Sequence, residues 1–183
     1  MHTFRNMSQL NDWLLAKGVD TSSWGKNGSK TVTHLWQEYT RGEVSFQDSP
    51  PLRRVNVVQL NIRRDNQVLI EAAQEFCDGR LRHRNQPPSE KMKPGESYID
   101  AALRCCQEEL GVSPERVQII PDTHKIIDVE TESISYPGLK TQYTFHIVDA
   151  TIKNLPESAF WKENEVKDKG DPIRRHYWVW QTV

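Results

Sequence analysis

The chain has 183 residues, of which 27% are charged and 36% hydrophobic, and its formal net charge is −1. This length suits one domain of about 130 residues with an extension, and the small net charge argues against a protein that coats nucleic acid through bulk charge. Three cysteines, two of them adjacent, do not make a disulfide framework and favour a reducing compartment. No apolar run approaches the roughly 18 residues of a membrane span, and the first residues have no hydrophobic signal core. We therefore expect a cytoplasmic protein with no membrane partner.

Residues 1–54 are expected to form an accessory helical hairpin followed by a linker. The first helix is predicted to end at Gly18, and the second is predicted to run from a Ser29 cap to Gly42. The apolar residues with helical spacing are Leu10, Trp13, Leu14, Val32, Leu35, Trp36 and Tyr39. We expect the aromatic side chains among them to pack on a core, and the alternative is that they hold a nucleobase.

Residues 55–183 are expected to form an α/β domain. Apolar residues alternate with polar ones in several short runs that are bounded by turn residues, which is typical of strands. The expected strands are Val55–Ile62, Gln67–Phe76, Arg116–Pro121, Lys125–Ser135, Thr141–Thr151 and Tyr177–Trp180. A helical turn is expected at Leu155–Phe160.

The segment Tyr98–Leu110 is predicted to be a helix with two adjacent carboxylates on one side. Ser97 is a candidate N-cap, and Gly111 is placed to end the helix in a left-handed conformation. Residues 105, 108 and 109 share a face because they are spaced by three and four positions. Glu108 and Glu109 therefore suit a hard divalent cation such as Mg²⁺, although a solvated charged face is the alternative for such a pair.

The segment from Glu90 to Val112 resembles the Nudix box, the signature of enzymes that cleave a nucleoside diphosphate linked to another group. The positions in register with that signature are Glu96, Arg104, Cys106 as a small apolar residue, Glu108, Glu109, Gly111 and Val112. The resemblance implies a Nudix-like α/β/α sandwich with a mixed sheet, preceded here by the helical hairpin. It also implies that Glu96 and Arg104 brace the helix and that Glu108 and Glu109 bind Mg²⁺ or Mn²⁺.

Two specified positions of the signature differ in this chain. Glu90 stands where the family has glycine, and Cys105 stands where it has a glutamate that acts as a metal ligand or base. A thiol is a poor ligand for magnesium, so the interpretation of Cys105 is a lost carboxylate, with a redox-sensing thiol as the alternative. Family members often take a further acid from a late loop, here Pro156–Asp171, where Glu165 is the candidate catalytic residue. Glu157 and Glu163 in the same loop are further options, and exposed loop charge is the alternative for all three.

The segment Asp78–Lys93 is expected to be a basic loop beside the expected substrate cleft. Its candidate phosphate-binding residues are Arg80, Arg82, Arg84 and Lys91. Arginine suits bidentate contact with phosphate, and a solvated basic loop is the alternative interpretation.

Three functions are compatible with these patterns. The first is a weak or divergent hydrolase of nucleoside diphosphate-linked compounds, and the second is a non-catalytic module that binds a phosphorylated small molecule or an RNA end. The third is a structural Nudix-like subunit of a larger assembly, with a protein partner docked on an exposed apolar patch of the N-terminal hairpin. The first two differ in metal-dependent turnover, and the third predicts no affinity for nucleotides.

Overall fold

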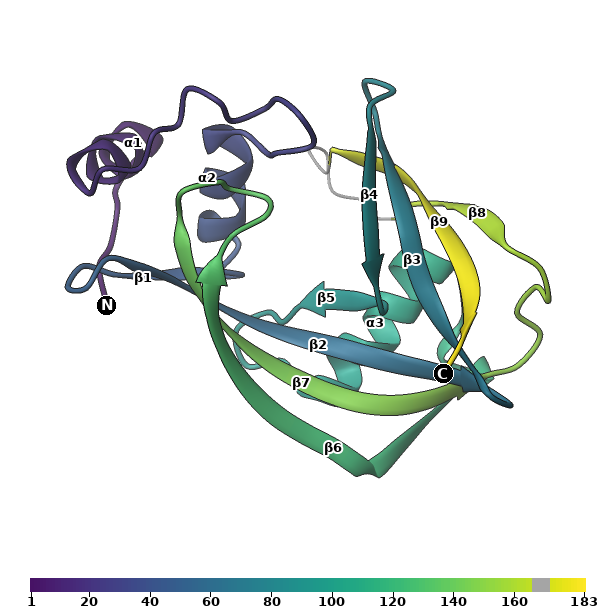
Figure 1. Cartoon of the computed structure of the whole chain (residues 1–183). Coiled ribbons are helices and arrows are strands. Elements are labelled where there is room, and N and C mark those ends of the chain that lie inside the picture. The colour runs from purple at the N-terminus through teal and green to yellow at the C-terminus, as the bar shows by residue number, and fades with distance from the viewer. Residues whose placement is uncertain (166–171) are drawn as a thin grey trace. The chain divides into compact units, whose positions relative to one another are not determined.

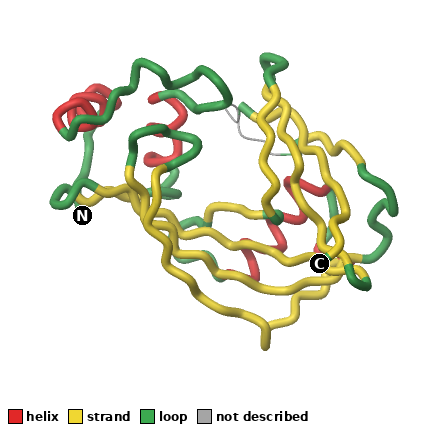
Figure 2. Tube along the Cα trace, in the orientation of Figure 1, coloured by secondary structure: helices red, strands yellow, loops and turns green. Residues whose placement is uncertain are grey.

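The computed structural model describes residues 1–165 and 172–183, which contain three α-helices, one 3₁₀-helix and nine strands (Figures 1 and 2). The strands follow the order β6-β7-β2-β3-β9-β8, and the short strands β1, β4 and β5 pair with β2, β3 and β2. The β2–β3 and β3–β9 pairs are antiparallel, whereas Figure 1 shows β2 and β7 running in the same direction. The predicted fold class, an α/β fold with a mixed sheet preceded by an N-terminal helical hairpin, is confirmed.

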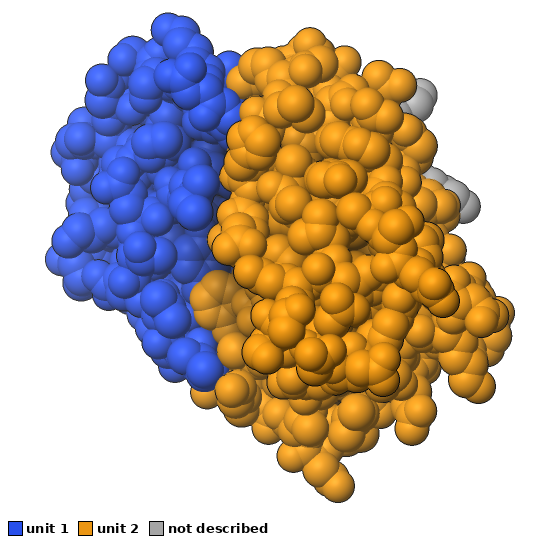
Figure 3. Space-filling model, turned by 45° about the vertical axis from the view of Figure 1, so that its right-hand side comes forward, with its two compact units in different colours: residues 1–56, 127–144 blue, residues 57–126, 145–183 orange. Residues whose placement is uncertain are grey.

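The chain divides into two compact units, coloured separately in Figure 3. Unit 1 contains residues 1–56 and 127–144, and unit 2 contains residues 57–126 and 145–183. The long strands β2 (Leu52–Arg64), β6 (Val117–Glu132) and β7 (Lys140–Ile152) each contribute residues to both units. The proposed domain boundary between residues 54 and 55 remains a prediction, and unit 1 also includes residues from the β6–β7 hairpin.

Unit 1 is built around helices α1 (Met7–Ala16) and α2 (Val32–Thr40) and strand β1 (Ser45–Gln47). Asn6 caps α1 by accepting a hydrogen bond from the Gln9 amide, and Thr31 caps α2 together with the His34 side chain. The predicted Ser29 cap is therefore wrong by two residues. The Ser29 hydroxyl instead donates to the Lys26 carbonyl at 2.6 Å, which closes the preceding turn.

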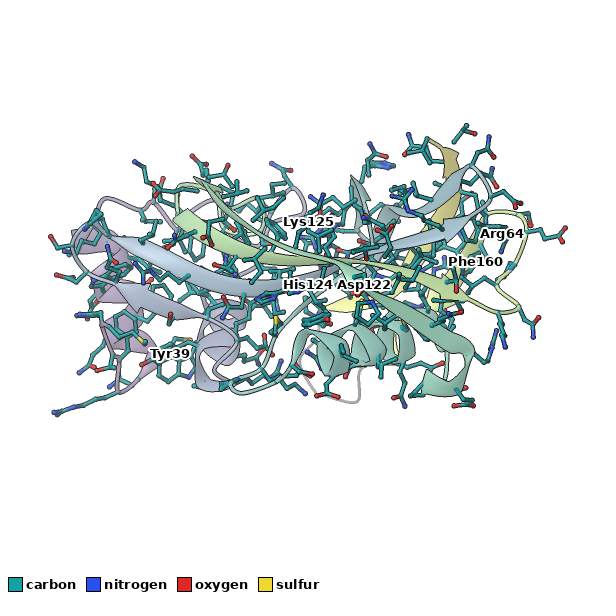
Figure 4. All side chains as sticks on the ribbon, turned by 90° about the horizontal axis from the view of Figure 1, so that it is seen from below. Tyr39, Arg64, Asp122, His124, Lys125 and Phe160 are labelled. Carbon is teal, nitrogen blue, oxygen red and sulfur yellow. The ribbon has the colours of Figure 1, made fainter. Side chains whose placement is uncertain are left out.

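Aromatic side chains of unit 1 pack against one another, and most of them are buried, whereas Trp36 and Tyr39 are half-buried. Phe4 lies within 5.7 Å of the rings of Trp13, Tyr39 and Phe46, measured between centroids, and Tyr39 is labelled in Figure 4. The Trp24 and Tyr136 rings are inclined by 52° with their centroids 5.1 Å apart, and Trp24 donates to the Pro137 carbonyl at 2.9 Å. The expectation that the hairpin aromatics pack on a core is confirmed for Trp13, because that side chain is buried.

Unit 2 packs one helix, α3 (Tyr98–Leu110), against the sheet. The buried core joins α3 residues such as Ala102 and Cys106 to Val58 and Leu60 of β2 and to Trp178 of β9. The remaining elements are β3 (Gln67–Phe76), β4 (Leu81–Gln86), β5 (Ser89–Lys91), the 3₁₀-helix η1 (Pro114–Arg116), β8 (Phe160–Glu163) and β9 (Ile173–Thr182). The predicted bounds of β3 and α3 are confirmed residue for residue.

Several local predictions are wrong. Strand β6 (Val117–Glu132) is continuous where the sequence predicts two strands, Arg116–Pro121 and Lys125–Ser135. Residues 155–160 form a bend that leads into β8 and not a helical turn. The Pro156 carbonyl there accepts hydrogen bonds from Trp180 at 2.8 Å and from Arg64 at 3.2 Å, and Arg64 also lies over the Trp180 ring. These contacts hold the segment against β9; Arg64 and Phe160 are labelled in Figure 4.

The segment Asp78–Lys93 forms strands β4 and β5 where the sequence predicts a loop. Along β4 the side chains at positions 82, 84 and 86 are half-buried, and those at 81, 83 and 85 are exposed. This alternation has the strand period of two. Long arginine side chains can cover a sheet surface with their methylene groups. The half-buried positions of β4 are therefore charged, and a search for alternating apolar residues does not detect the strand.

Candidate functional site

Helix α3 begins and ends where its sequence predicts. The Ser97 hydroxyl oxygen accepts from the Asp100 amide at 3.1 Å, and the Asp100 carboxylate accepts from the Ser97 hydroxyl at 2.7 Å. Gly111 ends the helix with φ of 62°, a left-handed conformation that glycine adopts without a side-chain clash. The first and last turns of α3 are therefore fixed by residues at the two ends of the helix itself.

A bidentate ion pair between Glu96 and Arg104 ties α3 to the loop before it. The Nε and Nη2 atoms of Arg104 donate to the two oxygens of Glu96 at 2.8 and 2.9 Å. Arg104 Nη2 also donates to the Lys91 carbonyl at 2.7 Å. Hydrogen bonds from Arg104 hold the pKa of Glu96 below its usual range. The predicted bracing pair is present.

Arg104 has two further carboxylate neighbours. Its Nη1 atom lies 3.2 Å from Glu108 and 3.7 Å from Glu90. The second distance matters because Glu90 replaces the glycine of the signature, so this chain adds a carboxylate beside the helix. Burial raises the pKa of Glu90, and the nearby Arg104 acts in the opposite direction.

Glu108 and Glu109 have different surroundings although they are adjacent in sequence. Glu108 is half-buried and is paired with Arg104, whereas Glu109 is buried. The Cys105 thiol, one turn earlier on the helix, lies 3.9 Å from a Glu109 carboxylate oxygen and is placed to donate to it. The two predicted metal ligands are thus each engaged with a residue of their own helix.

Cys105 is a fully buried neutral thiol. Burial and the neighbouring Glu109 raise its pKa well above the ordinary value, and burial raises the pKa of Cys106 to about 12. Thiolates, not thiols, ligate metals and react with oxidants. The alternative of a redox-sensing thiol therefore has no support in this environment.

Glu165 lies near the C-terminal end of α3. Its backbone amide donates to the Glu108 carbonyl at 2.8 Å, and its carboxylate pairs with Lys162 at 2.7 Å. Glu163 lies 3.9 Å from Arg174, and Glu157 is exposed. Residues 166–171 of the predicted acidic loop lie outside the described residues.

The predicted phosphate-binding residues are on or beside strands β4 and β5. Arg80 pairs with Asp78 at 2.8 Å, and Arg82 donates to the Gln74 side chain at 3.1 Å. Arg84 pairs with Glu71 at 3.1 Å. Lys91 is half-buried at the end of β5, where its carbonyl accepts from Arg104.

Sequence inspection did not single out the buried polar residues opposite β4. Glu71 on β3 and His176 on β9 form a hydrogen bond of 2.5 Å, although 105 positions separate them in the sequence. Glu71 is a carboxylate in an otherwise apolar part of its strand, and that is the one local signal for a special role. Its partner emerges only from strand pairing.

The comparison that decides the family covers most of the chain. The sequence pattern of the NUDIX domain matches residues 50–170. The chain belongs to the Nudix family. No curated protein matches the sequence.

Solved Nudix structures are similar to this chain at low sequence identity. One is the binary complex of an Ap4A hydrolase from C. elegans, at 16% identity over 69% of this chain and 79% of that chain, with a TM-score of 0.39. Another is a NUDIX hydrolase from Nitrosomonas europaea, at 19% identity over 68% of this chain and 70% of that chain, with a TM-score of 0.41.

The described side chains offer the divalent metal that a Nudix box implies fewer carboxylate ligands than the signature supplies. Among the described residues, no group of three or more His, Cys, Asp or Glu side chains is arranged to hold a metal ion. Arg104 already compensates the charge of Glu108, and the position of the third carboxylate holds a neutral thiol.

In the part of the chain that is described, no helix is long and apolar enough to cross a membrane.

Proposed function

We propose that this Nudix protein binds nucleoside diphosphate-linked compounds and hydrolyses them weakly or not at all. The observation that carries the proposal is the buried thiol of Cys105 beside Glu109, at the position where the Nudix signature has a carboxylate. The absence of this oxygen ligand lowers the affinity expected for Mg²⁺ or Mn²⁺, because hard cations require oxygen donors. Family membership and the intact Glu96–Arg104 brace support the retained fold of the box.

The charges near the box also favour binding over cleavage. Hydrolysis of a diphosphate requires a neutralised phosphate and an activated water. Glu108 is paired with Arg104, and Glu165 is paired with Lys162. Each of these two candidate acids is therefore compensated by a cation of unit 2. The candidate catalytic residues of this chain are Glu108, Glu109 and Glu165. Each would need to leave its present partner before it could bind a metal or activate a water.

The proposal is tested with a panel of nucleoside diphosphates linked to a sugar or to a second nucleoside. We expect calorimetry to detect binding, and we expect turnover with Mg²⁺ or Mn²⁺ to be no faster than that of the Glu108→Gln, Glu109→Gln double variant. Turnover more than about 10²-fold above this control, the scale of a working general acid or base, would identify an active hydrolase. Absence of binding to every compound would remove the proposal altogether.

Phosphate binding is proposed for the basic residues Arg80, Arg82, Arg84 and Lys91. Replacing Arg80 and Arg82 with alanine should weaken binding of a phosphorylated ligand. The slope of its logarithmic salt dependence should fall by about one for each arginine that bound a phosphate in the wild type. Arg84→Ala is measured as a separate variant, because Arg84 also compensates the buried Glu71 and its removal should lower stability as well. Unchanged affinity in the double variant would show that neither arginine binds phosphate and that both belong to an ordinary solvated surface.

The structural-subunit alternative is not proposed, because nothing in the described hairpin favours it. It requires a continuous exposed apolar patch on α1 and α2. The large hydrophobic residues that are exposed in these two helices, within the described part of the chain, are Met7 and Leu15, both on α1. Exposed single side chains of this kind are ordinary for a surface helix.

A further inference from the structure

The second half of strand β6 forms an unprotected sheet edge in unit 1. Strand β6 ends the strand order and pairs with β7 alone among the described strands (Figure 1). Residues 127–132 belong to unit 1, and all six are exposed. Native proteins usually protect an edge strand with lysine, proline, a bulge or a covering segment. The last proline and the last lysine of β6 are Pro121 and Lys125, so neither residue type protects positions 127–132.

The two faces of this segment differ in chemistry. Side chains of a strand point alternately to its two faces. The face of the odd-numbered residues carries Ile127 and Val129, which are each 40% exposed. The other face is acidic at every position, with Asp128, Glu130 and Glu132. The segment is therefore amphipathic, although both of its faces are exposed.

No cation compensates the acidic face. Asp128 accepts from the Thr144 hydroxyl at 2.6 Å, and Glu132 accepts from the Gly138 amide at 2.8 Å. Among the residues that the structure describes, none of the three carboxylates forms an ion pair, and that of Glu130 accepts no hydrogen bond. The segment thus combines the outward-facing backbone groups of an edge strand with one apolar face and one negative face.

We infer that residues 127–132 form a docking edge for an extended peptide segment that alternates apolar and basic residues. An added strand pairs with the outward-facing N–H and C=O groups of the edge, and its side chains lie opposite those of β6. Apolar residues of the partner meet Ile127 and Val129, and its basic residues meet the three carboxylates. This inference goes beyond the proposed function, which rests on the box of unit 2.

A second copy of this chain fits the edge less well than a basic partner does. Directly opposed residues of two antiparallel strands share a face. Because all the acidic residues of the segment lie on one face, antiparallel pairing of two copies through positions 127–132 would bring carboxylates opposite carboxylates. Opposed like charges are destabilising.

The test uses the ¹⁵N-labelled full-length protein and, as the probe, a synthetic peptide of alternating valine and lysine. We expect the backbone amide signals of residues 127–132 to shift when the peptide is added. A peptide of alternating valine and glutamate should leave them in place, because its charge repels the acidic face. A valine–lysine peptide with every backbone nitrogen methylated should not bind, since it keeps the charge but cannot donate to the edge.

Affinity measurements on three variants complete the test. Glu130→Lys should weaken binding of the valine–lysine peptide about tenfold, and Glu130→Gln should weaken it less. Asp12→Lys is the matched control, because Asp12 is an exposed acid on α1 of the same unit, and it should leave the affinity unchanged.

Three results would overturn the inference. Equal affinity for the methylated peptide would show attraction by charge alone, and unmoved signals at residues 127–132 would show that the edge accepts no strand. A wild-type dimer in sedimentation that protects the amides of these residues from hydrogen exchange would identify a second copy as the occupant.

Discussion

Replacing Glu38 with glutamine is expected to lower the free energy of unfolding by about 3 to 5 kcal/mol, the usual cost when a buried ion pair is left with one partner. Glu38 and Arg53 are 4% and 2% exposed, and Arg53 Nη2 lies 3.1 Å from a Glu38 oxygen. Burial acts to lower the pKa of Arg53, but the Glu38 carboxylate outweighs it, so the guanidinium stays charged. The variant would leave that charge in the core of unit 1. Urea unfolding of the full chain measures the change.

A half-exposed ion pair of unit 1 provides the control. Arg41 and Glu43 are 4.0 Å apart, and their side chains are 32% and 15% exposed. The Glu43→Gln variant should therefore change the free energy of unfolding by less than about 1 kcal/mol. An equally small change in the Glu38→Gln variant would show that the Arg53–Glu38 pair adds nothing to the stability of unit 1.

The parts of the fold that could be predicted are those with local signals. Helix α3 has a Ser97 cap, a left-handed Gly111 and an apolar stripe between them, and all three act within a few residues. Strand β3 is bounded by a turn and contains alternating and apolar residues. Strand β4 could not be predicted, because its arginine residues hide a period of two under a loop-like composition. Strand β5 has three residues, all half-buried, and is too short to give a local signal.

The residues of the candidate site could be predicted from the sequence, but most of the partners that each of them contacts could not. Glu96 and Arg104 are eight residues apart, and a helix with its preceding turn brings them together. Whether Glu108 and Glu109 act as a pair depends on their neighbours, which sequence spacing alone does not specify. The Glu71–His176 and Arg53–Thr141 hydrogen bonds join residues more than eighty positions apart. Such bonds follow from strand order and have no local signal.

Replacing Cys105 with glutamate is expected to destabilise the metal-free protein and to increase its response to Mn²⁺. Cys105 is fully buried beside Glu109. A second carboxylate at this place brings two like charges together and raises the pKa of one of them. Removing a carboxylate from water costs several kcal/mol when it is not compensated. The metal-free Cys105→Glu variant should therefore melt at a lower temperature than the wild type.

Manganese should reverse part of this destabilisation, because a metal that binds only the folded state stabilises it by linkage. The gain is about 2.7 kcal/mol when the metal is at one hundred times its dissociation constant. Cys105→Gln is the matched control, since it has nearly the size of glutamate without its charge and should respond to Mn²⁺ no more than the wild type does. Adding Glu90→Gly removes the carboxylate that lies 3.7 Å from Arg104, and we expect this double variant to gain turnover, by ~10²–10⁴ if a base and ligand are recovered. Melting curves with and without Mn²⁺ and a product assay measure both effects. If Cys105→Glu and Cys105→Gln respond alike, position 105 has no access to a metal, and the Nudix box of this chain serves binding alone.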